Sequence, residues 1–290
     1  MGVASARYGP LRMSPKAYNM VQMLLAVDIG NTNVTLGLFR GRRLSGSWRL
    51  FSDERKTADE MVLLLRGLTG VRGRAPGLSV AVAGVVPALE VLYREAARMM
   101  TGREALVINH ESPLGFAVRY REPGDVGADR LVNAAAAVAR HGAPVTVVDF
   151  GTAVTVDVVD RTRTYLGGAI LPGPELAAES LFRRTAKLPQ IALAGEARAV
   201  GRSTGESMRA GIILGLAAAV DGLLERTFRE LGGKSTVIAT GGAAPLVVPH
   251  SRLLSRIEPD LTLEGIRIVA ERMAAMRTSV PKTAGRRGGR

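Results

Sequence analysis

The sequence predicts an α/β fold built from two related lobes. The segment from Leu24 to Leu38 (LLAVDIGNTNVTLGL) and the segment from Val145 to Val159 (VTVVDFGTAVTVDVV) share one pattern. Each has an apolar β-type run that ends in Asp, a turn with Gly and Thr, and a second β-type run. Strand-like and helix-like stretches alternate around these two segments, which is typical of α/β proteins.

The repeated turn is suited to binding phosphate. Aligning Asp28 with Asp149 pairs Thr32 with Thr152 and leaves Asn31 as one extra residue in the first copy. Glycine N–H groups and a Thr hydroxyl can donate to an anion, and a neighbouring carboxylate is compatible with phosphate when a cation or water lies between them. One such turn could be purely structural. Two copies predict a nucleotide held between two lobes, which by analogy is the arrangement of actin-like ATPases and sugar kinases.

In the first half of the chain, predicted strands and helices alternate, as in an α/β domain. Met23–Val27 is expected to be the first core strand. Thr57–Leu68 is expected to be a helix because Asp59 and Glu60 fall in its first turn and its apolar residues lie on one side. The other expected elements are strands at Arg43–Leu50, Leu78–Val86 and Ala105–Ile108, a helix from Pro87 to about Met100, and a helix from Asp129 to about Ala139.

The second half predicts a long helix over Gly205–Leu231. Its residues Gly211, Gly215 and Ala217–Ala219 leave room for close helix packing, either within the chain or at a dimer interface. A helix from about Glu175 and a strand at Val237–Ala239 are also expected. We therefore expect an N-terminal lobe over residues 23–142 and a C-terminal lobe over residues 143–275.

Composition limits the function classes. The chain has 290 residues, 47% of them hydrophobic, which is enough for a sizeable core. It has no cysteine, which excludes disulfides, thiolate metal sites and a cysteine nucleophile, and fits a reducing cytoplasm. No run of 18 uninterrupted apolar residues occurs, so no membrane span is expected.

Much of the net charge of +13 lies at the two ends of the chain. Residues 1–22, expected to be a disordered extension or a mis-assigned start, carry +3, and residues 278–290 of the basic, disordered tail expected at residues 276–290 carry +4. The remaining +6 could attract an anionic substrate such as ATP. A nucleic-acid partner is less favoured, because aromatic residues make up only 4% of the chain and no stacking motif appears.

The segment before the helix at Asp129 offers a candidate acid or base. Asp129 and Arg130 fall at the start of that helix, where backbone N–H groups favour an anion. An alternative is that Asp125 or Asp129 only caps the helix.

Six motifs, taken in order, resemble the type III pantothenate kinases. They are DIGNTNVTLG at residues 28–37, Tyr120 with GADR at 127–130, DFGTAVTVD at 149–157, GGAILPG at 167–173, GRSTGESMRAGI at 201–212, and TGG at 240–242. The match runs from about Met23 to Met273. The resemblance implies a dimeric enzyme of the actin-like fold that phosphorylates pantothenate with ATP on the way to coenzyme A.

The resemblance also implies site residues. The ATP-binding residues it implies are Asp28, Ile29, Gly30, Asn31, Thr32, Asn33, Val34, Thr35 and Thr152. Asp129 would be the general base and Asp149 the ligand of a monovalent cation, K⁺ or NH₄⁺. The implied pantothenate contacts are Tyr120, Gly127, Ala128, Asp129, Arg130 and Thr204. Glu122 departs from the pattern, because relatives more often carry Asn there.

The chemistry of phosphoryl transfer agrees with these roles. The pantothenate hydroxyl must be aligned with the γ-phosphate while charge on the phosphoryl oxygens is neutralised. A carboxylate with an ordinary pKa of about 3.9 is ionised at neutral pH and can orient that hydroxyl and accept its proton. Donors from Thr32 and Thr152, with Mg²⁺ and a monovalent cation, would neutralise the charge.

Two rival functions share parts of the pattern. A sugar or acetate kinase would have the same phosphate turns and a different acceptor site, although zinc-containing sugar kinases of this fold need cysteines. A transcription-accessory protein related to the family is the non-enzymatic rival. The presence of both turns and of Asp129 favours catalysis, so we expect a cytoplasmic homodimer that binds a small molecule and no membrane.

Overall fold

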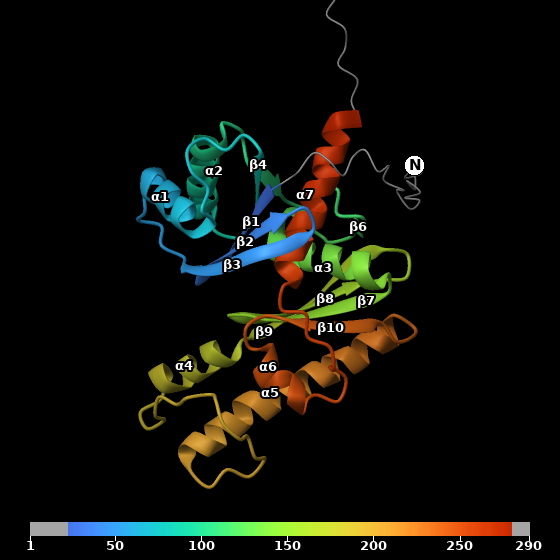
Figure 1. Ribbon diagram of the computed structural model, residues 1–290. Helices are drawn as coiled ribbons and strands as arrows, with labels where there is room; N and C mark the ends of the chain where they lie inside the picture. The colour runs from blue at the N-terminus through green and yellow to red at the C-terminus, as the bar shows by residue number, and fades with distance from the viewer. Residues whose placement is uncertain (1–22, 280–290) are drawn as a thin grey trace, which may run out of the picture.

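Two five-stranded sheets, with helices between them and on their outer faces, make up the protein (Figure 1). The computed structural model describes residues 23–279 of the chain. The predicted extension at residues 1–22 and residues 280–290 of the predicted tail lie outside the described residues.

The first sheet has the strand order β3-β2-β1-β4-β5, with β1 antiparallel to β2 and parallel to β4. Helix α1 begins with a capping box, because the Thr57 hydroxyl accepts from the Glu60 N–H and the Glu60 carboxylate accepts from the Thr57 N–H. The elements are β1 (Met23–Ile29), β2 (Asn33–Arg40), β3 (Arg43–Phe51), α1 (Ala58–Thr69), β4 (Leu78–Gly84), α2 (Pro87–Thr101) and β5 (Leu106–Ile108). All the elements predicted for this half before residue 109 are present.

The second sheet has the order β10-β7-β8-β9-β6. A 3-10 helix at Pro123–Asp125 and α3 (Ala128–His141) lead into it from the first half. Its strands are β6 (Ala117–Val118), β7 (Val145–Phe150), β8 (Ala153–Val159), β9 (Thr164–Pro172) and β10 (Thr236–Thr240). The remaining helices are α4 (Pro174–Arg184), α5 (Thr204–Glu230), α6 (Ala244–Val247), a 3-10 helix at Val248–His250, and α7 (Leu261–Ser279).

The two sheets follow the same plan. Strands β1, β2, β3 and β4 correspond to β7, β8, β9 and β10, and Ile257, which bridges in parallel to Ala239 of β10, takes the place of β5. Asp28 pairs with Thr35, and Asp149 pairs with Thr155. The first hairpin is therefore one residue longer than the second, as predicted.

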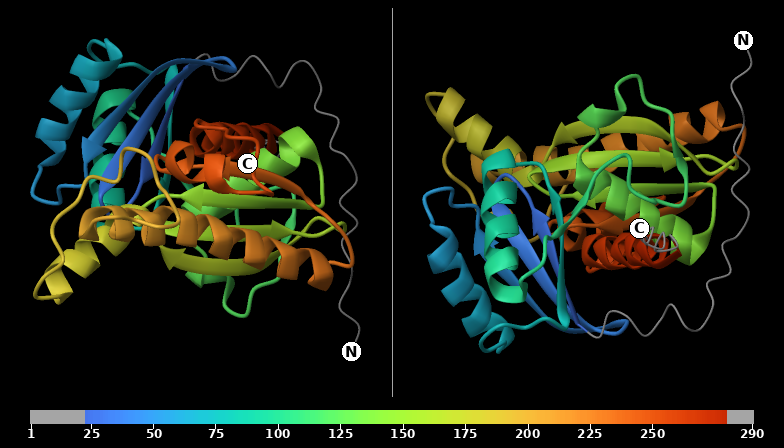
Figure 2. Two further views of the ribbon diagram at one scale, coloured as in Figure 1. Left: turned by 90° about the horizontal axis from the view of Figure 1, so that it is seen from below. Right: turned by 90° about the horizontal axis from the view of Figure 1, so that it is seen from above.

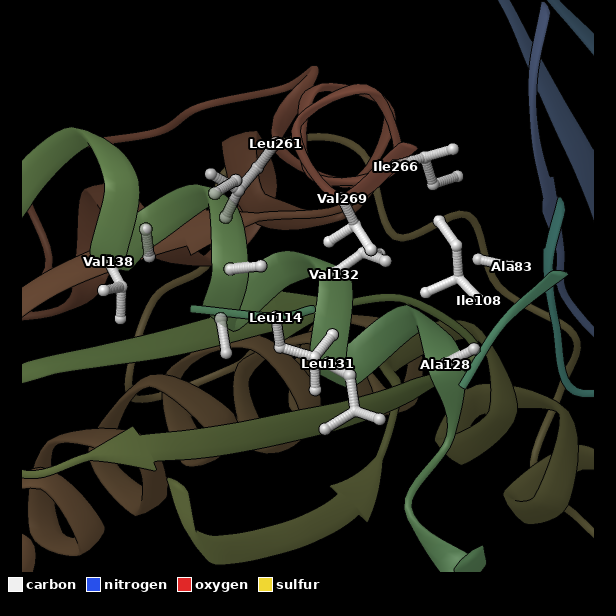
Figure 3. Packing of buried hydrophobic residues seen from close by; sticks show 14 of the residues in the cluster. Ala83, Ile108, Leu114, Ala128, Leu131, Val132, Val138, Leu261, Ile266 and Val269 are labelled. Atoms are coloured by element: carbon white, nitrogen blue, oxygen red, sulfur yellow. The ribbon is translucent and has the colours of Figure 1, made fainter. Parts of the chain in front are cut away.

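Helices α3 and α7 lie between the sheets and form the central core. Val132 of α3 and Val269 of α7 belong to this core (Figure 3). The two helices pack closely because a Cβ at Gly265 of α7 would collide with the Val132 carbonyl oxygen. Although α7 belongs to the second half of the chain, it packs against β1, β4 and β5 of the first sheet.

Further helices cover the outer faces of the sheets. Helices α1 and α2 pack on the first sheet, and α5 and α6 pack on the second (Figure 2). Within residues 23–279, α5 alone is long and apolar enough to cross a membrane, which is weak evidence because core helices pass the same test. Its residues Leu216, Val220 and Leu224 pack against the second sheet, as those of a core helix do.

The predicted start of the tail at residue 276 is wrong, because α7 continues to Ser279. Nothing in residues 276–279 interrupts a helix.

Candidate active site

The tips of the two hairpins meet. The hydroxyl oxygens of Thr32 and Thr152, which are 120 residues apart in sequence, lie 3.2 Å from each other. Each Thr lies in the turn between two antiparallel strands of its own sheet. The structure therefore brings together the two turns that the sequence pattern paired.

The glycine N–H groups of these turns do not face an anion, contrary to expectation. The Gly30 N–H donates to the Asn33 carbonyl at 3.0 Å, and the Gly151 N–H donates to the Ala153 carbonyl at 3.1 Å. Both bonds close their own hairpins. Among the described residues, the N–H groups of Asn31, Thr32 and Thr152 have no acceptor, so these are the donors left for a ligand.

Three carboxylates gather where β1, β7 and α3 meet. Burial raises the pKa of Asp28 well above its usual range, the charges of Asp129 and Asp149 raise it further, and Arg49 lowers it. Burial, then the charge of Asp129, raises the pKa of Asp149 to about 7. Burial also raises the pKa of Asp129. Carboxylates that resist ionisation in this way favour a bound cation.

Asp129 lies in the first turn of α3 and does not cap it. The cap residue is Gly127, which makes no side-chain capping bond, and the Asp129 carboxylate accepts from the Arg130 N–H at 2.8 Å. A Cβ at position 127 would collide with that carboxylate. Neither Asp125 nor Asp129 is therefore a simple helix cap, and Gly127 makes room for the Asp129 side chain.

Arg130 is buried and held by Asp157 of β8. Its Nε and one terminal nitrogen each lie 2.8 Å from Asp157 Oδ1, which also accepts from the Tyr165 hydroxyl at 2.6 Å. The Tyr120 ring lies 6.5 Å from the Tyr165 ring, and a Cβ at Gly167 would lie 2.7 Å from Tyr120. The predicted pantothenate residues Tyr120 and Arg130 are thus joined through Asp157 and Tyr165.

Asn133 connects the second hairpin to both central helices. Its side-chain amide donates to Asp149 at 2.9 Å and accepts from the Thr262 hydroxyl of α7 at 2.8 Å. The bond to Asn133 lowers the pKa of Asp149 but does not offset burial. Asp149 thus has a fixed orientation, and its side-chain hydrogen-bond partner among the described residues is the neutral amide of Asn133.

Not all of the predicted site residues have side chains near these carboxylates. The side chains of Ile29 and Val34 are buried in the core beneath the first sheet, so only their backbone can serve a ligand. Thr204 is exposed at the N-terminal end of α5, which lies at the far side of the second sheet from α3 (Figure 1). A single chain therefore does not bring Thr204 to Asp129.

Sequence reasoning missed Asn133, Ser52 and the role of Asp157. The position of Asp157 within the apolar sequence of β8 could have indicated its role, because a buried carboxylate needs hydrogen-bond or ion-pair partners. The Ser52 hydroxyl donates to the Gly30 carbonyl at 2.6 Å, and nothing in the local sequence marks it.

The residues present fit a metal ion that arrives with a nucleotide. No group of three or more His, Cys, Asp or Glu side chains placed to hold a metal ion occurs in residues 23–279. Magnesium in kinases is held by one or two carboxylates together with substrate phosphates, and Asp28 and Asp149 offer such carboxylates.

A family model for type III pantothenate kinase matches residues 24–226. The type III pantothenate kinase of Moorella thermoacetica is 45% identical over 252 residues, which are 86% of this chain and 99% of that protein. That of Thermomicrobium roseum is 45% identical over 253 residues, which are 87% and 98% of the two chains. The chain belongs to the type III pantothenate kinase family. The predicted resemblance is confirmed, and membership identifies an ATP-dependent pantothenate kinase that uses a divalent metal ion and a small-molecule substrate.

Solved structures confirm the predicted actin-like fold. The activator of 2-hydroxyisocaproyl-CoA dehydratase from Clostridium difficile, with bound ADPNP, has a TM-score of 0.55 at 17% identity and covers 90% of this chain and 99% of its own. A conserved Campylobacter jejuni protein, proposed to be a Baf family transcriptional activator, has a TM-score of 0.52 at 19% identity, covering 86% and 98%. At such identities the likeness concerns the fold alone.

Proposed function

We propose that this enzyme phosphorylates the primary hydroxyl of pantothenate at the meeting point of its two hairpins. The observation that carries the proposal is the contact between Thr32 and Thr152, which joins the hairpins that follow Asp28 and Asp149. The charges of Asp129 and Asp149 both raise the pKa of Asp28. Sugar and acetate kinases would share the hairpins, but the family assignment favours pantothenate.

Residues 28–35 and Thr152 would bind ATP. The hydroxyls of Thr32 and Thr152, which hydrogen-bond to each other, would donate instead to phosphate oxygens lying between them. The N–H groups of Asn31, Thr32 and Thr152 supply further donors. Donors fixed by two hairpins neutralise phosphoryl charge with little reorganisation.

Asp129 is the proposed general base. Its raised pKa makes it a stronger base than an exposed Asp while it remains able to ionise. As the pantothenate oxygen bonds to the γ-phosphorus, its proton passes to the Asp129 carboxylate. The bond from the γ-phosphorus to the bridging oxygen breaks, and ADP leaves with that electron pair.

Asp149 is the proposed ligand of a monovalent cation, and Asp28 would hold Mg²⁺ together with phosphate oxygens. Both carboxylates have raised pKa values that a nearby cation would lower. When bound, these ions would neutralise charge on the phosphates. Asn133 keeps Asp149 oriented for its cation.

Tyr120, Gly127, Ala128, Asp129 and Arg130 are the proposed pantothenate contacts from one chain. Thr204 would come from a second copy in a homodimer, because α5 holds it away from α3 within one chain. Dimerisation would thereby complete the acceptor site.

The exposed surface of α5 supports such a dimer. Gly211, Gly215 and Ala219 line an apolar cavity of about 390 Å³ between α5 and the segment from β9 to α4. A Cβ added at Gly211 or at Gly215 would have nothing within 4 Å, so this surface is free to receive a partner helix.

The lobe limits at residues 23–142 and 143–275 and a cytoplasmic location remain part of the proposal. The function is tested by a coupled assay of ADP release with pantothenate, sugars and acetate as acceptors. Turnover with pantothenate alone is expected. Preference for a sugar or acetate would reject the substrate, and no turnover with any acceptor would favour the non-enzymatic rival.

A further inference from the structure

Strand β3 places an arginine in line with the first hairpin. Asp28 of β1 pairs with Thr35 of β2, and Thr35 pairs with Arg49 of β3. Paired residues on neighbouring strands project from the same face of a sheet. Gly37, two residues after Thr35 in β2, faces Leu263 of α7. Arg49 therefore projects from the face that is turned toward the second lobe.

The Arg49 side chain reaches that lobe. A Cβ built on Gly242 would lie 3.7 Å from each of its two terminal nitrogens. Gly242 lies in the turn between β10 and α6 of the second sheet. A side chain from the first sheet thus ends beside the glycine turn of the second.

The Arg49 guanidinium has no protein partner among residues 23–279. It is exposed and makes no hydrogen bond or ion pair with a residue in the described part of the chain. Arg130, in contrast, is held by Asp157. Arg49 lies close enough to Asp28 to lower the pKa of that carboxyl. An unpaired guanidinium near Asp28 can offset the repulsion that this carboxylate exerts on an anion.

We propose that Arg49 binds the phosphate chain of ATP and links the two lobes around the nucleotide. Its planar guanidinium can donate two parallel hydrogen bonds to phosphate oxygens, which a lysine cannot do. The inference rests on the proposed function only in taking ATP as the nucleotide.

Equilibrium binding of ATP and AMP to Arg49→Ala and Arg49→Lys tests this role. Because a hydrogen bond to a charged group is involved, Arg49→Ala is expected to weaken ATP binding about 10- to 100-fold. AMP, which lacks the β- and γ-phosphates, should lose much less affinity, and Arg49→Lys should recover part of the loss. The KM for pantothenate should stay unchanged.

Arg43→Ala is the matched control, because Arg43 is an exposed arginine at the other end of β3. It should bind both nucleotides as the parent does. Equal ATP affinity in parent and Arg49→Ala, equal losses for ATP and AMP, or the same loss in Arg43→Ala would each overturn the proposal. Binding is measured without acceptor, so a parent that binds ATP but does not phosphorylate pantothenate would reject the proposed function and leave this test intact.

Discussion

The two hairpins have equivalent backbone hydrogen bonds. They differ in the residue that packs against each hairpin tip. Ser52 follows β3 and Gly173 follows β9, and each donates its N–H at 3.0 Å to the carbonyl of the Thr at its hairpin tip. Ser52 adds a side-chain bond to the Gly30 carbonyl at 2.6 Å. A Cβ at Gly173 would instead collide with the Gly151 carbonyl. The two copies therefore keep the same backbone hydrogen bonds but differ in the space left for a side chain next to the hairpin.

The central helices differ more sharply. Arg130 of α3 meets Asp157 of β8, and at the corresponding position of the first sheet Leu263 of α7 approaches Gly37 of β2. Asp129 and Arg130 on α3 therefore correspond to Thr262 and Leu263 on α7. Within residues 23–279 the turn with Gly and Thr occurs twice, but the proposed base occurs once, so the two lobes cannot exchange roles.

The largest effect is expected from removing that single base. Asp129→Asn should lower kcat about 10²- to 10⁴-fold, the range for a positioned acid or base. ATP affinity should change little, because the hairpins are intact. Steady-state kinetics with pantothenate and nucleotide binding would measure both.

Asp125→Asn is the control for this substitution, since Asp125 is an exposed carboxylate in the 3-10 helix just before α3. It should retain parental turnover. Near-normal turnover of Asp129→Asn would show that another group accepts the proton.

Because Ser52 and Gly173 pack differently against their hairpins, we expect alanine to destabilise the protein more at position 173 than at position 52. Gly173→Ala forces the chain away from the second hairpin and should lower the free energy of unfolding by about 1–3 kcal/mol, as overpacking does. Ser52→Ala loses one hydrogen bond, about 1 kcal/mol. Urea unfolding would compare them. A Gly173→Ala protein as stable as the parent would mean that the second hairpin is looser than its geometry indicates.

Repetition explains why so much was predictable from sequence. The alignment of Asp28 with Asp149 gave both hairpins and the one-residue difference in their lengths, because hairpin register follows a local pattern. The capping box at Thr57 and the glycine after α1 similarly mark the limits of that helix within the local sequence.

The remaining features depend on contacts between distant segments. The bonds from Asn133 to Asp149 and from Arg130 to Asp157 join residues 16 and 27 positions apart. The approach of Arg49 to the turn at Gly242 spans both lobes. The glycine N–H groups were assigned to phosphate because a glycine turn does not reveal which of its donors closes the hairpin.

A smaller effect is expected at the outer surface of the second lobe, where Gly215 of α5 is exposed. Gly215→Leu should shift the protein toward monomer and raise the KM for pantothenate more than that for ATP, because the hairpins lie within one chain. Leucine fits the isolated chain, since a Cβ at position 215 has nothing within 4 Å. Sedimentation and kinetics would report both effects.

Gly67→Leu on α1 is the matched control, because Gly67 is also an exposed helical glycine at which an added Cβ would have nothing within 4 Å. It should leave assembly and kinetics unchanged. A fully active monomer at assay concentration would reject both the interface and the contribution of Thr204 from a second chain.

The smallest expected effect is on thermal stability, and it distinguishes Asp149 from Asp28, the two carboxylates at the ends of β7 and β1. The folded-state pKa of Asp149, about 7, exceeds its ordinary value of 3.8, so the folded protein binds this proton more tightly than the unfolded chain does. Stability therefore falls as pH rises from about 4 to about 7. At pH 8 in choline chloride, Asp149→Asn should melt several degrees above the parent. Potassium chloride should raise the melting temperature of the parent, since a ligand of the folded state stabilises it.

The variant should not respond to potassium, because Asp149 supplies the proposed cation site. In the variant, burial and the charge of Asp129 still raise the pKa of Asp28, and the contribution of Asp149 is lost, so the difference between the melting curves reports Asp149 together with its effect on Asp28. Asp129 and Asp157 act on Asp149 in the parent and remain in the variant. If parent and variant respond equally to potassium at pH 8, the cation does not bind at Asp149. If only the parent responds, the second hairpin differs from the first in carrying its own monovalent cation.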